Sequence, residues 1–594
     1  MHPTAPAPTP PSAARPPAAP RVFHRSFLGF LRDLSSASQR FWVLVAATGA
    51  AGGLGAVFLV HLLRGVQTLV WSPVPGNLDG ADAASPPLVR LVVPIAGGVI
   101  VSAVALVLRR PLGGHGTSGV IEAIWARSGH LGLKNALVRG VVSIIAVGMG
   151  ASLGREGALI QSGAATGSHL AERFKVATDQ GRLLVAAGAA AGIAAAYNMP
   201  IGASLFGLEV FLGSFALELF GPIVIACVIA VFLSRILIAD HPTYQIPAYA
   251  LGSAPRDLIV SLAVGLILGV ASAIYIKVVD LSSAAVARLP RKLIYLLPPI
   301  AMAILGVVAL WFPQVLGNGY SAVNAELLVG MPIGLLLVLP AIKLAMTALC
   351  SSFGVPGGTF TPSLFYGALL GGALGAIAQR IVPGAGPPQA FALVGMCAAL
   401  AGTTHATVSA TVMIFELTGN YGVVLPLLLA SVASAAVSKR LSRESLYTAP
   451  LKRKNVQLPE MPRPGWLGAT PTRDLVVADA PRIEPQARFP EVLRRLLELG
   501  PGQALYVCTP DGQYVGLIVA TAIGAHLRDE AVLDVVVADD VVDRATLPVA
   551  LDGPLAGVAL RFGETSLERL PVVDDAGRFA GTVSRSDVLR RGRF

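Results

Sequence analysis

Long apolar stretches of uneven length occupy the chain between Phe41 and Ser438. Four of them are close to the length of about 20 residues that a helix needs to span a bilayer: 41–63, 91–108, 258–276 and 417–438. Two others, 344–379 and 381–415, are too long for one span and too short for two with ordinary loops, and Gly and Pro interrupt both. This pattern predicts half-helices and re-entrant segments, whose backbone must face protein or a water-filled cavity. We therefore expect an all-α polytopic membrane domain of tilted helices at residues 36–451.

The pattern changes after Leu451. Residues 452–465 are basic and then Pro-rich, which is typical of a linker, and residues 466–594 carry frequent charges. Two pairs of short apolar runs flank turn dipeptides and predict hairpins: 505–508 with 514–519, and 570–573 with 579–583. Helical patterns at 490–499 and 586–591 accompany the hairpins. We expect two similar small α/β units, packed as one soluble cytoplasmic domain.

Composition and charge agree with a membrane protein. Hydrophobic residues make up 54% of the 594 and charged residues 13%, against about 25% in soluble domains, which excludes a purely cytosolic enzyme. The net charge of +11 indicates cytoplasmic anchoring and not nucleic-acid binding. A disordered Pro/Ala-rich tail at 1–35 leads to arginines before the first span, so we expect a plasma (inner) membrane protein with both termini cytoplasmic. The four cysteines are far apart and predict neither disulfides nor a metal site.

An internal repeat runs through the apolar region. A segment of 22 residues that ends at Glu209 resembles one that ends at Glu416, an offset of 207. At the same offset Gly150 falls on Gly357 and Ser152 falls on Thr359. Chance similarity between Ala/Gly-rich segments is the alternative, but a common register across two Gly-rich breaks favours duplication. Two duplicated, inverted halves would place a binding site at their interface, on broken helices.

Two motifs look enzymatic, and their context disfavours that interpretation. Residues 114–119 fit the G-x-G-x-x-G pattern of dinucleotide folds, but they follow an apolar span and not a strand. Residues 150–154 fit the G-x-S-x-G pattern around Ser152, but their flanks are Ala/Gly/Ile-rich membrane sequence. An intramembrane serine hydrolase therefore remains only a remote alternative, and we expect that the protein is not an enzyme.

Three Gly-rich breaks share a physical theme. Each one opens a short apolar segment, near Ser118, Glu156 and Phe360. A helix that begins inside a membrane exposes unpaired N–H groups and roughly half a positive charge. Several such ends aimed at one point bind an anion without a full positive charge, so the ion is free to leave. Close helix packing is the alternative role for these glycines. Three breaks, two of them with hydroxyl residues, favour an anion pathway.

These breaks also carry a family resemblance. Gly154 to Ala158 (GREGA) is similar to the GREGP signature of the CLC chloride channels and proton-coupled chloride exchangers. Residues 357–362 (GGTFTP) resemble their GxFxP signature, and residues 117–121 (TSGVI) resemble their GSGIP signature. The soluble tail resembles a cystathionine-β-synthase (CBS) domain pair. The resemblance implies a homodimer in lipid, with one pore per subunit and chloride as the transported ion.

The resemblance also implies residue roles. Ser118 and Tyr447 would donate hydroxyls to a central chloride, joined by the backbone N–H groups of Thr359 and Phe360. Glu156 would be the gate, because its ionised carboxylate competes with chloride and its protonated form swings away. The alternative for Glu156 is a pair with Arg155, but adjacent residues on a helix point in different directions. The remaining residues of the expected anion pathway are Gly154, Arg155, Gly157 and Gly358.

Val210 separates two kinds of transport. Proton-coupled exchangers of the family have a second glutamate at this position, directly after the one that matches Glu209. Valine cannot carry a proton, so the residue favours a passive chloride channel, with a chloride/proton antiporter as the alternative. Glu209 and Glu416 are isolated acids at equivalent repeat positions. For these two we favour a shared structural role, in which each accepts N–H groups from a neighbouring break.

Departures from the family pattern bear on ion selectivity. Thr117, Val120-Ile121 and Ala158 differ from the signatures and affect the fine geometry of the site. Ser118 is retained where nitrate exchangers have proline, which favours chloride over nitrate. Fluoride-specific relatives lack this serine and the tyrosine that matches Tyr447, so fluoride is disfavoured.

The tail offers one further candidate site. Residues 581–587, with Thr582 and Asp587, resemble the ribose-binding stretch of CBS domains. The first copy has Ala522 at the position that matches Asp587, so only one half matches. Adenine-nucleotide binding and a purely structural role are equal alternatives, and no cofactor is required for transport.

Overall fold

The computed structural model describes most of the chain: residues 36–71, 84–114, 116–238, 244, 246–247, 249, 254–456, 471–499, 504–519, 535–565 and 567–592. It forms two compact units, residues 1–458 and 459–594. The predicted tail at 1–35, most of the predicted linker and Ala522 lie outside the described residues.

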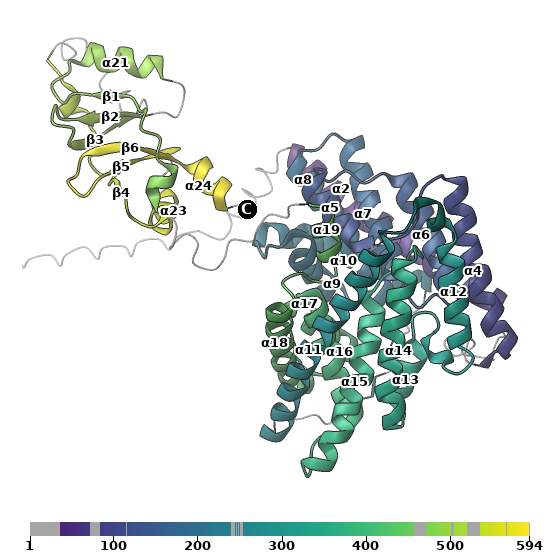
Figure 1. Cartoon of the computed structure of the whole chain (residues 1–594). Coiled ribbons are helices and arrows are strands. Elements are labelled where there is room, and N and C mark those ends of the chain that lie inside the picture. The colour runs from purple at the N-terminus through teal and green to yellow at the C-terminus, as the bar shows by residue number, and fades with distance from the viewer. Residues whose placement is uncertain are drawn as a thin grey trace, which may run out of the picture. The chain divides into compact units, whose positions relative to one another are not determined.

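The described part of the first unit is all-helical (Figure 1). Its first half contains α2 (Ser36–Val70), α4 (Pro87–Val107), α5 (Gly116–Ala126), α6 (Leu133–Gly148), α7 (Glu156–Arg173), α8 (Thr178–Tyr197), α9 (Pro200–Phe206), the π-helix η2 (Gly207–Leu212) and α10 (Leu217–Ile238). Its second half contains α11 (Pro255–Val286), α12 (Leu297–Val308), α13 (Tyr320–Leu328), α14 (Ile333–Ser352), α15 (Phe360–Ile381), α16 (Pro388–Thr404), α17 (Thr407–Thr418) and α18 (Val424–Leu441). Short 3₁₀ turns η3 (Arg291–Tyr295), η4 (Pro313–Val315) and η5 (Tyr421–Val423) and the helix α19 (Ala449–Arg453) complete it.

The helices confirm the broken, uneven pattern. Within the described residues, seven helices are long and apolar enough to cross a membrane. The stretch 344–379 divides between α14 and α15, and the stretch 381–415 divides between α16 and α17. One predicted boundary was wrong: the stretch 417–438 is not one helix. The left-handed Gly419 (φ 60°) ends α17 there, and α18 begins only at Val424.

The two halves repeat each other, although not at a single offset. Tyr197 and Thr404 end equivalent helices 207 positions apart, and left-handed residues, Asn198 and His405, follow them. At the breaks the offset is 204, because the positive-φ glycines are Gly150 and Gly354. The predicted match of Gly150 to Gly357 and of Ser152 to Thr359 was therefore wrong by three residues. The end of α16 lies 44 positions after the start of α15, whereas the end of α8 lies 41 positions after the start of α7. The second repeat is therefore three residues longer over this pair of helices.

Two glutamates join the halves reciprocally. The Glu209 carboxylate accepts the Ser409 N–H at 2.8 Å and its hydroxyl at 2.5 Å, at the start of α17. The Glu416 carboxylate accepts the N–H groups of Ile201 (3.0 Å) and Gly202 (2.6 Å), at the start of α9. Each acid thus satisfies the unpaired N-terminal donors of a helix in the other half. The predicted structural role of these acids is confirmed.

The second unit contains two similar α/β units. In the first, β1 (Arg482–Ile483) runs parallel to β2 (Ala504–Cys508), which forms a hairpin with β3 (Tyr514–Val519), and α21 (Phe489–Glu498) packs on the sheet. In the second, β4 (Val549–Ala550), β5 (Arg569–Val573) and β6 (Phe579–Ser584) have the same topology, with α23 (Leu555–Glu564) and α24 (Arg585–Gly592). Both hairpins and both predicted helices are confirmed. The Tyr506 and Phe579 rings stack with their centroids 5.1 Å apart, and this contact links the two small α/β units to each other.

Candidate functional site

Three helices begin at one place, as the Gly-rich breaks predict. The α7 and α15 ends are tied by a two-residue bridge, in which Gly154 and Gly358 exchange N–H···O bonds of 2.7 Å. The α5 end lies against α7, because a Cβ built on Gly116 would fall within 3.0 Å of the Gly157 backbone. No side chain caps the start of α7 or α15. Their first-turn N–H groups and partial positive charges therefore converge from both halves of the repeat.

Glu156 is the first residue of α7, and its side chain is 1% exposed. One carboxylate oxygen, Oε1, accepts hydrogen bonds from the hydroxyls of Tyr197 and Thr361. The other oxygen, Oε2, has no hydrogen-bond partner among the described residues. A buried carboxylate with one free oxygen is either an acceptor for a further donor or a site for a proton.

The glycines around Glu156 leave room for its carboxylate. A Cβ on Gly154 or on Gly358 would lie within 3.0 Å of Oε2. Alanine at either position would therefore displace the carboxylate or separate the bridge between α7 and α15. Arg155 does not share this space, because its guanidinium lies over the rings of Tyr197 and Tyr320, at 5.6 and 5.4 Å from their centroids.

An aromatic wall leads from Glu156 to the other predicted chloride ligands. The Tyr197 ring lies 5.9 Å from Phe360, and Phe206 lies 6.0 Å from Phe360 and 6.2 Å from Tyr447. Tyr447 is buried, and its hydroxyl has no hydrogen-bond partner among the described residues. The Ser118 hydroxyl donates to the Tyr447 carbonyl at 2.8 Å. The structure thus brings the predicted residues of this site into one continuous region.

The Thr359 hydroxyl is a further buried polar group at this site. Thr359 immediately precedes α15 and is 2% exposed. Its hydroxyl oxygen has no hydrogen-bond partner among the described residues. Together with Oε2 of Glu156 and the Tyr447 hydroxyl, it gives the region unsatisfied hydrogen-bonding capacity next to the α15 amide groups.

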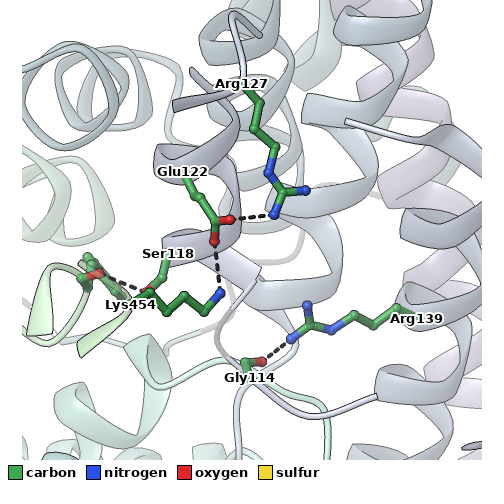
Figure 2. Close-up of polar contacts among 7 residues, drawn as sticks. Gly114, Ser118, Glu122, Arg127, Arg139 and Lys454 are labelled. Carbon is green, nitrogen blue, oxygen red and sulfur yellow. Dashed lines mark hydrogen bonds and ion pairs between the residues drawn. The ribbon is translucent and has the colours of Figure 1, made fainter. Parts of the chain in front are cut away.

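Ion pairs hold α5, the helix that carries Ser118, in place (Figure 2). Glu122 lies between Arg127, with which it forms an ion pair, and Lys454, whose Nζ is 2.8 Å from its carboxylate. Arg139 of α6 donates to the Gly114 carbonyl just before α5. Lys454 follows α19, so the chain that leaves the membrane unit is tied to the helix that presents Ser118.

The second half holds α13 in an equivalent way. Lys343 of α14 lies 204 positions after Arg139 and donates to the carbonyls of Val315 (3.0 Å) and Gly317 (2.8 Å), before α13. A cation bonded to backbone carbonyl groups, half-buried Arg139 in one repeat and buried Lys343 in the other, therefore fixes the start of a short helix in each repeat. Such groups position the helix ends without contacting Glu156.

Sequence reasoning missed the hydroxyl partners of Glu156. The direct partners, Tyr197 and Thr361, lie 41 and 205 positions after Glu156, and Tyr320, which contacts Tyr197, lies 164 positions after it. Thr361 belongs to the GGTFTP segment, but Tyr197 and Tyr320 lie outside every motif. The signal that could have found Tyr197 is its place at the end of the repeated Ala-rich helix, directly before the left-handed Asn198.

The remaining predicted residues lie in separate surroundings. Val210 is half-buried in the π-helix η2 and packs against the apolar core. Ser152 is buried, and its hydroxyl has no hydrogen-bond partner among the described residues.

The residues proposed to bind a nucleotide lie on β6 and α24, in the second of the two small α/β units. Thr582 is buried, and its hydroxyl accepts a hydrogen bond from Arg569 at 3.2 Å. Asp587 is a half-buried residue in the first turn of α24. On β2, burial raises the pKa of the Cys508 thiol to about 11, so this thiol is neutral at physiological pH.

Short helices from two inverted repeats, with their N-termini gathered around a buried carboxylate, define a membrane transport protein for small anions. Comparisons with known proteins agree. The profile of the family described as voltage gated chloride channel matches residues 96–439, and the CBS domain profile matches residues 537–593. The chain therefore belongs to the voltage-gated chloride channel (CLC) family of chloride transport proteins, and it carries a CBS domain pair.

Individual proteins that resemble this chain belong to the same family. The ClcB-like protein of Ralstonia nicotianae is 35% identical over 422 residues, which cover 69% of this chain and 97% of that protein. A Salmonella dublin protein named voltage-gated ClC-type chloride channel ClcB is 32% identical over 412 residues, 67% of this chain and 96% of that protein. A slow cyanobacterial Cl⁻/H⁺ antiporter shares the fold, with a TM-score of 0.62 and 22% identity over 70% of this chain and 98% of its own.

Proposed function

We propose that the protein is a passive chloride channel in which Glu156 is the gate. The observation that carries the proposal is the position of the Glu156 carboxylate, buried between the starts of α7 and α15 with one oxygen free. Ionised, the carboxylate occupies the place where the converging helix ends attract an anion. Protonated, it loses that attraction and leaves the place to chloride.

Two observations favour a channel over an antiporter. Val210 cannot pass a proton, and Glu209 is engaged with the start of α17. The Salmonella relative carries the name of a chloride channel, whereas the likeness to the cyanobacterial antiporter is one of fold alone. A passive channel lets chloride run down its gradient and moves no protons against theirs.

Proton coupling tests this proposal directly. The full-length chain is reconstituted in liposomes with an outward chloride gradient, and internal pH and chloride are followed together. We expect chloride efflux with no proton movement beyond that of protein-free liposomes. Uphill proton transport that stops when the chloride gradient is removed would establish the antiporter instead. Absence of any chloride flux would reject both forms of transport.

We propose that the central chloride is held by the hydroxyls of Ser118 and Tyr447 and the N–H groups of Thr359 and Phe360. The free Tyr447 hydroxyl supports this assignment. Ser118 would turn its proton from the Tyr447 carbonyl to the ion. The α15 amides at this point have no side-chain cap.

Proline at position 118 should change anion selectivity. Ser118 is the third residue of α5, where the N–H has no intrahelical acceptor, so Ser118→Pro removes the hydroxyl with little cost to the helix. We expect the nitrate-to-chloride permeability ratio to rise about fivefold, the effect of one lost hydrogen bond. Anion flux measurements with matched nitrate and chloride gradients give the ratio. Ser118→Ala separates loss of the hydroxyl from the effect of proline, and an unchanged ratio in both variants would exclude Ser118 as a ligand.

The remaining assignments are proposals of the same kind. We propose a homodimer with one pore per subunit in the plasma (inner) membrane, with both termini cytoplasmic and lipid around it. We also propose that residues 452–465 link a membrane domain at 36–451 to a cytoplasmic CBS pair at 466–594, after a tail at 1–35. Adenine-nucleotide binding at Thr582 and Asp587 is the regulatory candidate.

A further inference from the structure

We propose that the hydroxyls of Tyr197, Tyr320 and Thr361 form a latch that holds the ionised Glu156 carboxylate and sets the pH at which the gate opens. The inference rests on the proposed gating role of Glu156 and adds the groups that control it. These three residues, called the hydroxyl latch below, come from α8, α13 and α15. Tyr197 and Thr361 donate to one oxygen of the carboxylate, and Tyr320 contacts the Tyr197 hydroxyl.

Proton counting gives the latch a direction. Tyr197 and Thr361 both donate to Oε1 of Glu156, and each hydroxyl has one proton to give. The Tyr197 oxygen lies 2.9 Å from the Tyr320 oxygen, so Tyr320 donates to Tyr197. The Thr361 oxygen is also 2.8 Å from the Tyr197 oxygen, but with both protons directed at Oε1 this contact carries no hydrogen bond. The order Tyr320 to Tyr197 to Glu156 leaves every donor in this chain satisfied when the carboxylate is ionised.

The latch favours the ionised carboxylate over the neutral acid. Hydrogen bonds to a charged acceptor are stronger than those to a neutral one, and donors in series reinforce each other. Burial opposes this effect, because it disfavours charge. The balance between burial and the hydroxyl latch therefore decides how acidic the solution must be before Glu156 gains a proton and leaves.

Other charged or titratable groups face the latch from the surrounding elements. The Arg155 guanidinium lies over the Tyr197 and Tyr320 rings. The Tyr244 ring packs edge-on against Tyr320 at 5.3 Å, and Tyr447 lies beyond Phe206. Arg139 of α6 lies close to Gly157, on the first turn of α7. The titratable side chains of the neighbouring α2, namely Arg40, His61 and Arg64, are exposed.

Removing the hydroxyls without the rings tests the latch. Tyr197→Phe keeps the contacts of the ring with Phe360 and Arg155 but removes one of the two donors to Oε1. We expect the midpoint of the pH dependence of chloride flux to move by about one pH unit toward higher pH, since one hydrogen bond to a charged group is lost. Tyr320→Phe removes only the second donor in the series, so its shift should have the same sign and be smaller.

Tyr244→Phe is the matched control. Tyr244 is a buried tyrosine beside the latch, and its hydroxyl has no hydrogen-bond partner among the described residues. Its replacement removes the same atom from the same aromatic cluster and should leave the midpoint unchanged. Thr361→Val and Thr361→Ser form a second pair: valine should raise the midpoint, and serine, which keeps a hydroxyl, should restore it. This pair remains decisive if Tyr197→Phe fails to fold.

The outcomes separate the latch from the gate. Chloride flux is measured in liposomes across acidic and neutral pH for each variant, with Glu156→Gln as the reference. If Glu156→Gln abolishes the pH dependence while Tyr197→Phe and Thr361→Val keep the original midpoint, the latch is wrong and the gate stands. If Glu156→Gln keeps the pH dependence, the proposed gate itself is wrong. A shift in Tyr244→Phe equal to that in Tyr197→Phe would indicate general packing and overturn the latch.

Discussion

Replacing Glu156 by glutamine should make chloride flux independent of pH, at a rate equal to or above the highest rate that the original protein reaches in acid. The sign follows from the charge of the gate. Under the proposed gating role the neutral form of Glu156 is the open one, so we expect flux in the original protein to rise as the pH falls. Glutamine has the shape of the protonated acid and stays neutral at every pH, so it cannot compete with chloride as an anion. The measurement is chloride efflux from liposomes over a series of pH values.

Glu326→Gln is the control for this prediction. Glu326 is another buried carboxylate of the membrane unit, on α13, and it accepts the Met331 N–H at 2.8 Å. Glutamine can still accept that bond, so the variant should fold and keep the pH dependence. If flux through the Glu156→Gln protein still rose in acid, another group would be the gate. If both variants lost the pH dependence, the effect would not be specific to Glu156.

Alanine at Gly163 or Gly188 should destabilise the membrane unit more than any exposed change. The two glycines face each other across α7 and α8, and a Cβ on either would lie well within 3.0 Å of the carbonyl oxygen of the other. Both obstacles are helix backbone, so the helices must separate, which places the cost at the upper end of the overpacking range, about 3 kcal/mol. Gly367 and Gly395 make the same reciprocal contact between α15 and α16, so alanine there should have the same effect.

Gly55→Ala in α2 and Gly334→Ala in α14 are the matched controls. A Cβ at either position would have no atom within 4 Å, so alanine should be neutral or stabilising by up to about 1 kcal/mol through helix propensity. The measurement is the thermal unfolding midpoint of the detergent-purified protein. The midpoint is the temperature at which half of the monodisperse peak on size-exclusion chromatography is lost. Equal midpoints for Gly188→Ala and Gly55→Ala would show that the α7–α8 contact tolerates a methyl group.

The sequence predicted the helix starts more accurately than the register between the repeats. Gly-rich breaks place the starts of α5, α7 and α15 correctly, because glycine permits the turn and the close approach that such a break requires. The reciprocal roles of Glu209 and Glu416 followed from their equivalent positions. The three-residue change of offset between the breaks and the ends of α8 and α16 was missed, because Ala/Gly-rich helices match each other almost equally well at several offsets.

The sequence by itself determined that this is a broken-helix membrane protein with a soluble α/β tail, that anion-attracting helix ends occur at three breaks, and that Glu156 stands at one of them. Hydrophobic length, glycine placement and isolated charge are local properties, and they can be read in order along the chain. Only the tertiary structure decided that two hydroxyls bind that carboxylate and that a third hydroxyl binds one of these two. Tyr197, Tyr320 and Thr361 come from three different helices, and their meeting depends on how the two inverted repeats close on each other. That closure is a property of packing, which no local pattern encodes.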